Sequence, residues 1–254
     1  MKFSRLTLSF ASALLFVVGV VAHAQQHEVK TAKVNTSSSS VQLGNKVIVI
    51  PAPEGYEEAT AQFKQIKDRF SATEAPENDM LLVHLPLTDC ELLRQGSNAT
   101  YVQYTKISVL RAARSLNVTS AIMTLAVEEL RKSAPAFLDP NSPELQKIQR
   151  QVSRGLSQAD AKETKVDFGK PVMLGEFNVK PDLFSMLLLL TVKGTVGGVA
   201  VTTPMLLSVS YVRVKERLIF VYAYRKFDSK VDVEPLKLFT EKWTGSIIAA
   251  NVTK

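Results

Sequence analysis

The last third of the chain has the clearest pattern of apolar and polar stretches. An apolar run over residues 184–192 is followed by a glycine-rich connector at 194–198 and a second apolar segment over 199–214. A charged turn at 215–217 then leads into 218–224, which is rich in β-branched and aromatic residues. Connections this short cannot hold the crossover that parallel strands need, so the pattern predicts neighbouring antiparallel strands.

A helix is predicted after these strands, from about residue 235 to 250. Pro235 suits a first helical turn, and Asp232 or Glu234 can accept hydrogen bonds from the unpaired N–H groups there. The apolar side chains of this segment recur at steps of three and four, and therefore share one face: Leu236, Phe239, Trp243, Ile247 and Ala250. We expect this face to lie across the sheet.

Earlier segments alternate between strand and helix patterns. Strands are predicted at 41–50, 80–87, 101–110 and 170–177. In the third of these the alternation changes phase between Tyr104 and Ile107, which predicts a bulge there. Helical spacing covers 56–70, 119–132 and 143–159.

Two of these helices have recognisable ends and faces. Ser142 suits the N-cap of the helix at 143–159, with Pro143 in its first position. The helix at 119–132 is expected to end before Pro135. Its inward residues are predicted to be Ile122, Leu125, Ala126 and Leu130, and those of the helix at 143–159 to be Leu145, Ile148, Val152, Leu156 and Ala159.

These elements predict an α+β domain. We expect a single, mostly antiparallel sheet of about six or seven strands, with helices packed on it and the terminal helix across it. No repeat of 20–50 residues and no break in composition divides the chain, so residues 41–254 are expected to form one domain.

The start of the chain has the pattern of a signal peptide. Lys2 and Arg5 precede an apolar run over 6–21, and Ala22 and Ala24 fit the small-x-small cleavage pattern. The alternative is a membrane anchor, but the run is short for a span and polar chain follows it. Residues 1–24 are therefore interpreted as a signal peptide, and the protein is expected to be exported, periplasmic or extracellular.

The segment that follows, residues 25–40, is polar and ends in four serines. It has little to bury, so we expect a disordered tail. The whole chain has 31 basic and 24 acidic side chains and a charge of +7, and loss of Lys2 and Arg5 would leave +5. That mildly basic charge has no dense run of the kind that would favour nucleic acid as a partner.

Candidate chemistry is sparse. Cys90 is the only cysteine, which excludes an intrachain disulfide and favours a small buried side chain over a reactive thiol. His23 lies in the signal peptide and His27 in the tail, which leaves His84, expected on the more polar face of its strand. These residues make neither a zinc pattern nor a Gly-x-Ser-x-Gly turn, so neither a metal nor a cofactor is expected.

Three further groups have structural and functional interpretations. The 194–198 connector precedes a strand and lacks a Gly-Lys-Ser/Thr ending, which favours a hairpin over a phosphate loop. Tyrosines in the last strands either line a pocket or, as we favour, pack under the terminal helix: Tyr211, Tyr222 and Tyr224. Carboxylates near predicted strand ends, at Asp79, Asp89, Asp167 and Asp182, have no spacing that pairs any two as catalytic groups.

A basic stripe is predicted on the outer face of the helix at 143–159, formed by Lys147, Arg150 and Arg154. Such a stripe is either a solvated polar face, which we favour, or a weak contact for anionic lipid headgroups or an acidic partner.

The order of elements in the last third resembles the C-terminal half of the Mog1/PsbP-like fold. The resemblance rests on the apolar strand, the hairpin, the aromatic strand 218–224, and Phe227-Asp228-Ser229 before a helix that contains tryptophan. The segment 47–56, a strand stopped by Pro and Gly, is similar to the beginning of that fold. The resemblance implies an antiparallel sheet sandwiched by helices, and accessory or binding proteins that share no catalytic residues.

We therefore expect an exported, non-enzymatic binding or accessory protein. Its partner would be a protein or a small apolar ligand, bound over the free sheet face or at the rim near 194–198. The alternative is a hydrolase with a carboxylate- or Ser-based site in a cleft. Titratable groups that converge in one deep pocket would favour the enzyme, and a shallow apolar concavity would favour binding.

Overall fold

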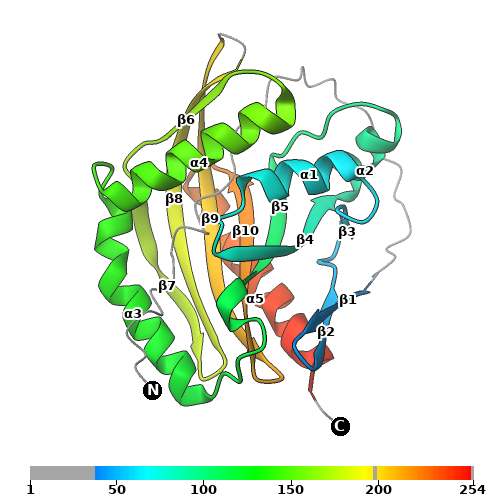
Figure 1. Cartoon of the computed structure of the whole chain (residues 1–254), viewed down its shortest axis with the longest axis vertical. Helices are drawn as coiled ribbons and strands as arrows, with labels where there is room; N and C mark the ends of the chain where they lie inside the picture. Colours follow the sequence, from blue (N-terminus) through cyan, green and yellow to red (C-terminus); the bar gives the residue numbers. More distant parts are fainter. Residues whose placement is uncertain (1–37, 197–198, 253–254) are drawn as a thin grey trace.

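The computed structural model describes residues 38–196 and 199–252 (Figure 1). The predicted signal peptide, with Ala22 and Ala24, and the predicted tail up to residue 37 lie outside the described residues, so cleavage stays a prediction.

Among the described residues, eight antiparallel strands form the main sheet, in the order β3-β4-β5-β10-β9-β8-β6, with β7 also paired to β8. In chain order the strands are β3 (Tyr56–Glu58), β4 (Asn78–Pro86), β5 (Gln103–Leu110), β6 (Thr164–Phe168), β7 (Val172–Lys180), β8 (Leu183–Val196), β9 (Val199–Val214) and β10 (Arg217–Lys226). The hairpin β8–β9 is paired out to Val196 and Val199. Lys215 and Glu216, both with positive φ, form the tight turn between β9 and β10.

A second, two-stranded sheet consists of β1 (Ser38–Leu43) and β2 (Lys46–Pro51). Side chains, rather than strand pairing, fix this hairpin to the rest of the fold. The amide of Asn251 bonds both the N–H and the C=O of Val49, and Trp243 Nε1 donates to the carbonyl of Pro51. Arg217, which is buried, donates from Nε to the carbonyl of Leu43.

In the part of the chain that the structure describes, five α-helices cover the sheet: α1 (Lys64–Thr73), α2 (Leu87–Arg94), α3 (Ser120–Leu138), α4 (Pro143–Asp160) and α5 (Val233–Ala250). Short 3-10 turns, η2 (Arg111–Ala113) and η3 (Lys230–Asp232), precede α3 and α5. None of the described helices is both long and apolar enough to cross a membrane.

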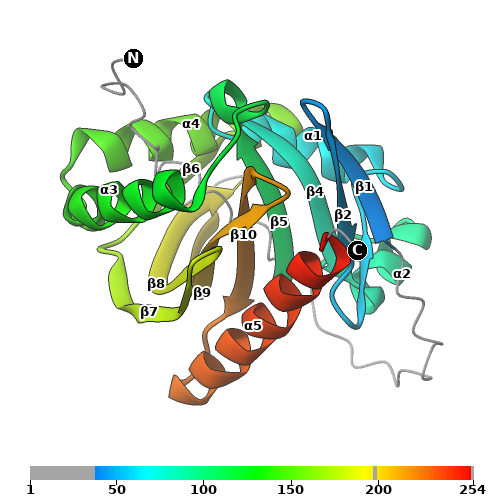
Figure 2. The same ribbon diagram turned by 90° about the horizontal axis from the view of Figure 1, so that it is seen from below.

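Figure 2 shows the layers edge-on: α3 and α4 lie on one side of the sheet, and α5 lies on the other. Helices α1, α3 and α4 pack on the face that carries Tyr104, Phe220, Tyr222 and Tyr224. The hairpin β1–β2 and α5 pack on the opposite face, where Ile107, Val212 and Val221 meet Trp243 and Ile247.

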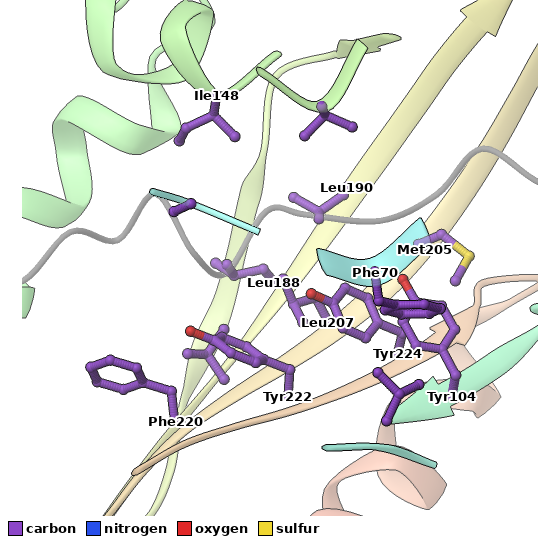
Figure 3. Close-up of a cluster of buried hydrophobic side chains, with 14 of the residues drawn as sticks. Phe70, Tyr104, Ile148, Leu188, Leu190, Met205, Leu207, Phe220, Tyr222 and Tyr224 are labelled. Atoms are coloured by element: carbon purple, nitrogen blue, oxygen red, sulfur yellow. The ribbon is translucent and has the colours of Figure 1, made fainter. Parts of the chain in front are cut away.

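The first of these cores is aromatic (Figure 3). The rings of Tyr104 and Tyr224 stack with centroids 4.4 Å apart, and Phe70 of α1 meets Tyr104 edge-on at 5.4 Å. A charged pair lies in the same layer, because Lys106 Nζ lies 4.8 Å from the ring centre of Tyr222 and donates to Glu74 at 2.9 Å.

The prediction of an α+β fold with an antiparallel sheet and a terminal helix across it is confirmed, and the strand count is corrected. Within the described residues the main sheet has eight strands and a separate hairpin has two. The segment predicted as one strand at 41–50 is that hairpin. Its first strand begins at Ser38, inside the predicted tail, because Ser38–Ser40 pair with Val49–Pro51.

The helix predicted at 56–70 is wrong in its first half. Residues Tyr56–Glu58 pair with β4 as strand β3, and the helix begins only at Lys64. The apolar positions that suggested the helix are buried all the same, because a strand and a helix joined by a turn bury them in one core: Tyr56, Ala59, Phe63, Ile66 and Phe70.

Two details of other elements are also corrected. The bulge lies in β4, between Met80 and Leu82, whereas β5 alternates irregularly because both its faces are buried. Helix α3 runs through Pro135 to Leu138, and Pro135 is exposed, so the carbonyl group that its ring frees is near water. Leu125 is 62% exposed, because α3 buries Met123, Ala126, Val127 and Leu130 instead.

The expectation of a free sheet face for binding is wrong. α5 and the hairpin cover the face opposite α1, α3 and α4. Ser185, Ser208 and Ser210 are fully buried in neighbouring strands on the α5 side, and their small side chains let the helix come close.

Candidate functional site

His84 is a core residue. As expected, it lies on the opposite face of β4 from Val83 and Leu85, but α5 covers that face and His84 is fully buried. Its ring lies edge-on to Trp243 at 5.5 Å, and Nδ1 is 3.1 Å from the hydroxyl of Thr105. Burial lowers the pKa of His84 to about 3. A histidine that stays neutral and inaccessible in this way is a poor general base for a bound substrate.

Cys90 is buried, which confirms the packing interpretation. Burial raises the pKa of its thiol to about 12, so the reactive thiolate is disfavoured.

The four singled-out carboxylates have separate partners. Asp79 bonds Arg111 and Arg114, and Asp182 bonds Arg213. Asp167 accepts a bond from Gln149, and Asp89 accepts bonds from backbone N–H groups of the loop that follows α2. Burial acts to raise the pKa of Asp79, but its two arginine partners outweigh burial and lower that pKa. Among the described residues, no three His, Cys, Asp or Glu side chains gather as a possible metal site.

Tyr211, Tyr222 and Tyr224 pack in the core, as favoured, but under the helices of the opposite layer rather than under α5. Burial raises the pKa of Tyr224 well above its usual value.

The rim near the glycine connector is a shallow hollow of about 320 Å³ on the arm formed by β6, β8 and β9. Its lining includes Lys165, Asp167, Lys193 and Thr202, which are exposed side chains. The hollow therefore has charge but little depth.

The basic stripe lies on the exposed side of α4. Lys147, Arg150 and Arg154 are all exposed, and Lys147 pairs with Glu77 at 3.2 Å. The inward residues opposite the stripe are buried as predicted, except for the exposed Ala159. Ser142 caps the helix by accepting a bond from the N–H of Leu145.

A better-formed cavity lies where α1, α4 and the α2–β5 loop meet. We call it the α1–α4 pocket. It has a volume of about 210 Å³ and is lined by Gln65, Arg69, Leu93, Gly96, Ser97, Asn98, Tyr101, Ala159 and Asp160.

The charged wall of the pocket comes from two helices. Gln65 and Arg69 lie one turn apart on α1 and so point the same way. Asp160 is the last residue of α4, followed by Ala161 in the left-handed conformation, and its carboxylate bonds Arg69. The side chain of Arg69 is 13% exposed and that of Asp160 is 25% exposed, so both are largely withdrawn from water.

The loop wall is built by the end of α2. Gly96, with φ of 77°, allows a Schellman ending in which Gly96 N–H bonds the carbonyl of Leu93 and Ser97 N–H bonds that of Leu92. The buried carboxylate of Asp89 then accepts bonds from the N–H and hydroxyl of Thr100.

Tyr101 forms the floor of the pocket. It has a φ of 52°, which is unusual for a bulky residue, and its N–H is held by Asp89 Oδ2 at 3.3 Å. The guanidinium carbon of Arg69 lies 5.5 Å from the centre of its ring. Burial raises the pKa of Tyr101. Asp89 thus positions a strained loop that places Tyr101 beneath Arg69.

Sequence reasoning missed Arg69, Tyr101 and Asp160 as site residues, and none lies in a recognisable motif. Asp89 was noticed as a carboxylate near a strand end, but its role here is to hold the loop. A signal was present in Gly96, since glycine is common just after the last turn of a helix and can fix the geometry of the loop that follows.

No protein-family model and no curated protein matches the chain. Solved structures show a weak likeness to it. The Saccharomyces cerevisiae Ran-binding protein Mog1p has a TM-score of 0.35 and 11% identity, over 85% of this chain and 95% of that one. A mutant of protein Mog1 has a TM-score of 0.34 and 11% identity, over 85% and 94%. The resemblance expected from the sequence is therefore present as a weak likeness to the Mog1/PsbP-like fold, and to the fold alone.

Proposed function

We propose that this is an exported, non-enzymatic binding protein, and that the α1–α4 pocket holds a small polar ligand. The observation that carries the proposal is one cavity faced by an ion pair that is largely withdrawn from water, Arg69 with Asp160. Polar groups on the pocket wall, rather than a large apolar lining, favour a polar molecule over the apolar ligand expected from the sequence.

The rim supplies further hydrogen-bonding groups. Gln65, Ser97 and Asn98 line the pocket, and within the described part of the chain their side chains make no hydrogen bond. Amide and hydroxyl groups can both donate and accept, so they can adapt to a polar ligand.

The hydrolase alternative has less support. The groups that would serve it are engaged elsewhere: His84 lies under Trp243, Cys90 is buried, and Asp89 is held by backbone N–H groups. In the pocket itself the carboxylate of Asp160 is already engaged by Arg69.

Titration of the isotope-labelled protein with pools of small polar metabolites, followed by amide chemical shifts, tests the binding site. We expect shifts at residues 65–69, 96–101 and 159–160. Gln65→Ala and Asn98→Ala should weaken binding, whereas Gln158→Ala, an exposed amide on α4 outside the pocket, should leave it unchanged. Shifts confined to 165–167 and 193–202 would instead place binding in the shallow hollow on the arm formed by β6, β8 and β9.

Export has its own test. Protein isolated from its native cells should begin at Gln25, since cleavage is expected after Ala24. A chain that retains residues 1–24 would contradict the cleaved, exported form.

A further inference from the structure

We infer that the α1–α4 pocket recognises a small zwitterion of the α-amino acid class. The ligand would replace the Arg69–Asp160 ion pair with two ion pairs of its own. This inference rests on the proposed binding function and names the chemical class of its ligand.

The charge balance of the pocket is the first argument. Arg69 and Asp160 both line the cavity and are bonded to each other, so the two charges cancel. A ligand that carries only an anion would pair with Arg69 but would leave Asp160 partly buried without its partner. A ligand that carries only a cation would take from Arg69 the carboxylate that it now contacts. Breaking a largely withdrawn ion pair on one side only is unfavourable, whereas a zwitterion offers a new partner to both side chains.

The electrostatic surroundings of Asp160 and Arg69 also favour a ligand with one ammonium and one carboxylate. Asp160 closes the 18-residue helix α4, and a helix C-terminus favours a positive group such as an ammonium. The guanidinium of Arg69 presents a planar fork of donors that suits a carboxylate. It is held in place by the ring of Tyr101, 5.5 Å away.

The spacing of the charges restricts the ligand further. Because Arg69 Nη1 and Asp160 Oδ1 are in contact, the ammonium and carboxylate that replace them must also be close together, as on a single carbon. The cavity has a volume of about 210 Å³. That space suits a single amino acid, whose side chain would reach the polar groups of Gln65, Ser97 and Asn98.

The test compares matched ligands on the unaltered protein. Each of the twenty common L-amino acids is added in turn, and the rise in Tm is measured. The strongest stabiliser is then compared by calorimetry with its 2-hydroxy acid, which lacks the ammonium, and with its carboxamide, which lacks the carboxylate. We expect Kd to increase at least about tenfold for each analogue, since each loses one charge-assisted bond to the protein.

The variant Asp160→Asn provides the second part of the test. It keeps the shape of the side chain but removes its charge, so amino acid binding should weaken at least about tenfold and the 2-hydroxy acid should become the tighter ligand. Asp167→Asn, an exposed carboxylate on β6, is the matched control and should change neither affinity.

The outcomes separate this inference from the proposed function. Equal affinity for amino acid and 2-hydroxy acid, or an unchanged preference in Asp160→Asn, would overturn the zwitterion and leave a polar binding pocket. If no amino acid binds but the metabolite pools still shift the pocket amides, the zwitterion is also overturned and the polar binding pocket remains. If neither the amino acids nor the pools bind at the pocket, both the inference and the proposed function are wrong.

Discussion

Gly155 of α4 lies directly against the backbone of Ala72 in α1. A β-carbon added to Gly155 would lie 2.1 Å from the carbonyl oxygen of Ala72 and 2.6 Å from its carbonyl carbon. Backbone atoms cannot rotate away as a flexible side chain can, so only glycine permits this close crossing. The crossing sets the distance between the two helices that form the charged wall of the pocket.

Gly155→Ala should therefore destabilise the protein. Although alanine is the better helix former, separating the helices should lower the free energy of unfolding by about 1–3 kcal/mol, measured by urea denaturation. Gly245→Ala is the matched control, because a β-carbon on that glycine of α5 meets nothing within 4 Å. It should raise stability by about 0.5–1 kcal/mol. If both variants gain stability, the close crossing is not as tight as described.

Asp89→Ala should loosen the floor of the pocket. It removes the acceptor for the N–H groups of Thr100 and Tyr101, at a cost of about 1–3 kcal/mol of unfolding free energy. Amide hydrogen exchange should accelerate at residues 96–101, and ligand affinity should fall. Asp182→Ala, which removes a partly exposed carboxylate that pairs with Arg213, should cost at most about 1 kcal/mol and spare the loop. Unchanged exchange at 96–101 would argue against a positioning role for Asp89.

His84 should make stability depend on pH. Burial lowers its pKa from 6.5 to about 3 in the folded protein, so between these values the unfolded chain takes up a proton that the folded chain does not. Above pH 6.5 the histidine is neutral in both states and does not make stability depend on pH. As pH falls from 6.5 towards 3, protonation of His84 in the unfolded chain progressively lowers the free energy of unfolding. The expected slope is up to roughly 1.4 kcal/mol per pH unit.

Urea unfolding at several pH values between 7.5 and 4 measures this slope. The double variant His84→Phe with Thr105→Val should lose stability less steeply than the unaltered protein, because the carboxylates titrate alike in both. Thr105→Val alone keeps the histidine and should keep the slope. Parallel curves for the unaltered and double-variant proteins would show that His84 does not contribute.

The buried pair of Glu74 and Lys106 should behave as a unit. Their side chains are 5% and 1% exposed, and Glu74 also accepts a bond from the hydroxyl of Ser108. Lys106→Met leaves the carboxylate buried without its cation and should cost about 3–5 kcal/mol. Glu74→Gln combined with Lys106→Met should cost clearly less than the sum of the two single changes in a double-mutant cycle. Additive costs would mean that the two charges are not coupled.

The basic stripe can be tested on vesicles. If Lys147, Arg150 and Arg154 contact anionic lipid, the protein should sediment with phosphatidylserine vesicles at low salt and be released at high salt. Replacing all three by glutamine should abolish sedimentation. The same change at Lys226, Lys230 and Lys237, on the β10–α5 side, should not. Failure to sediment even at low salt would leave the stripe as a solvated helix face.

Local periodicity was sufficient for much of the fold. The spacing of Leu236, Trp243 and Ile247 predicted the inward face of α5, and Ser142 with Pro143 predicted the start of α4. Both depend on residues within a few turns of one another. The errors arose where distant pairing prevailed: Tyr56–Glu58 form a strand only because β4 lies beside them. Similarly, β5 loses its alternation because helices cover both of its faces.

The candidate site could not be predicted from the sequence for the same reason. Arg69 and Asp160 are 91 residues apart, and each alone is an ordinary charged residue on a helix. The pocket exists because Gly155 lets α4 approach α1 and because Asp89 holds Tyr101 in an unusual conformation. Such a meeting of separate segments has no local signature.

The attachment of the first hairpin has a consequence for how the chain assembles. β1 and β2 are synthesised early, but their partners Arg217, Trp243 and Asn251 all belong to the final stretch. The layer that covers this side of the sheet therefore cannot close until residues 217–251 have been made. Until then, this face of the sheet stays open during synthesis.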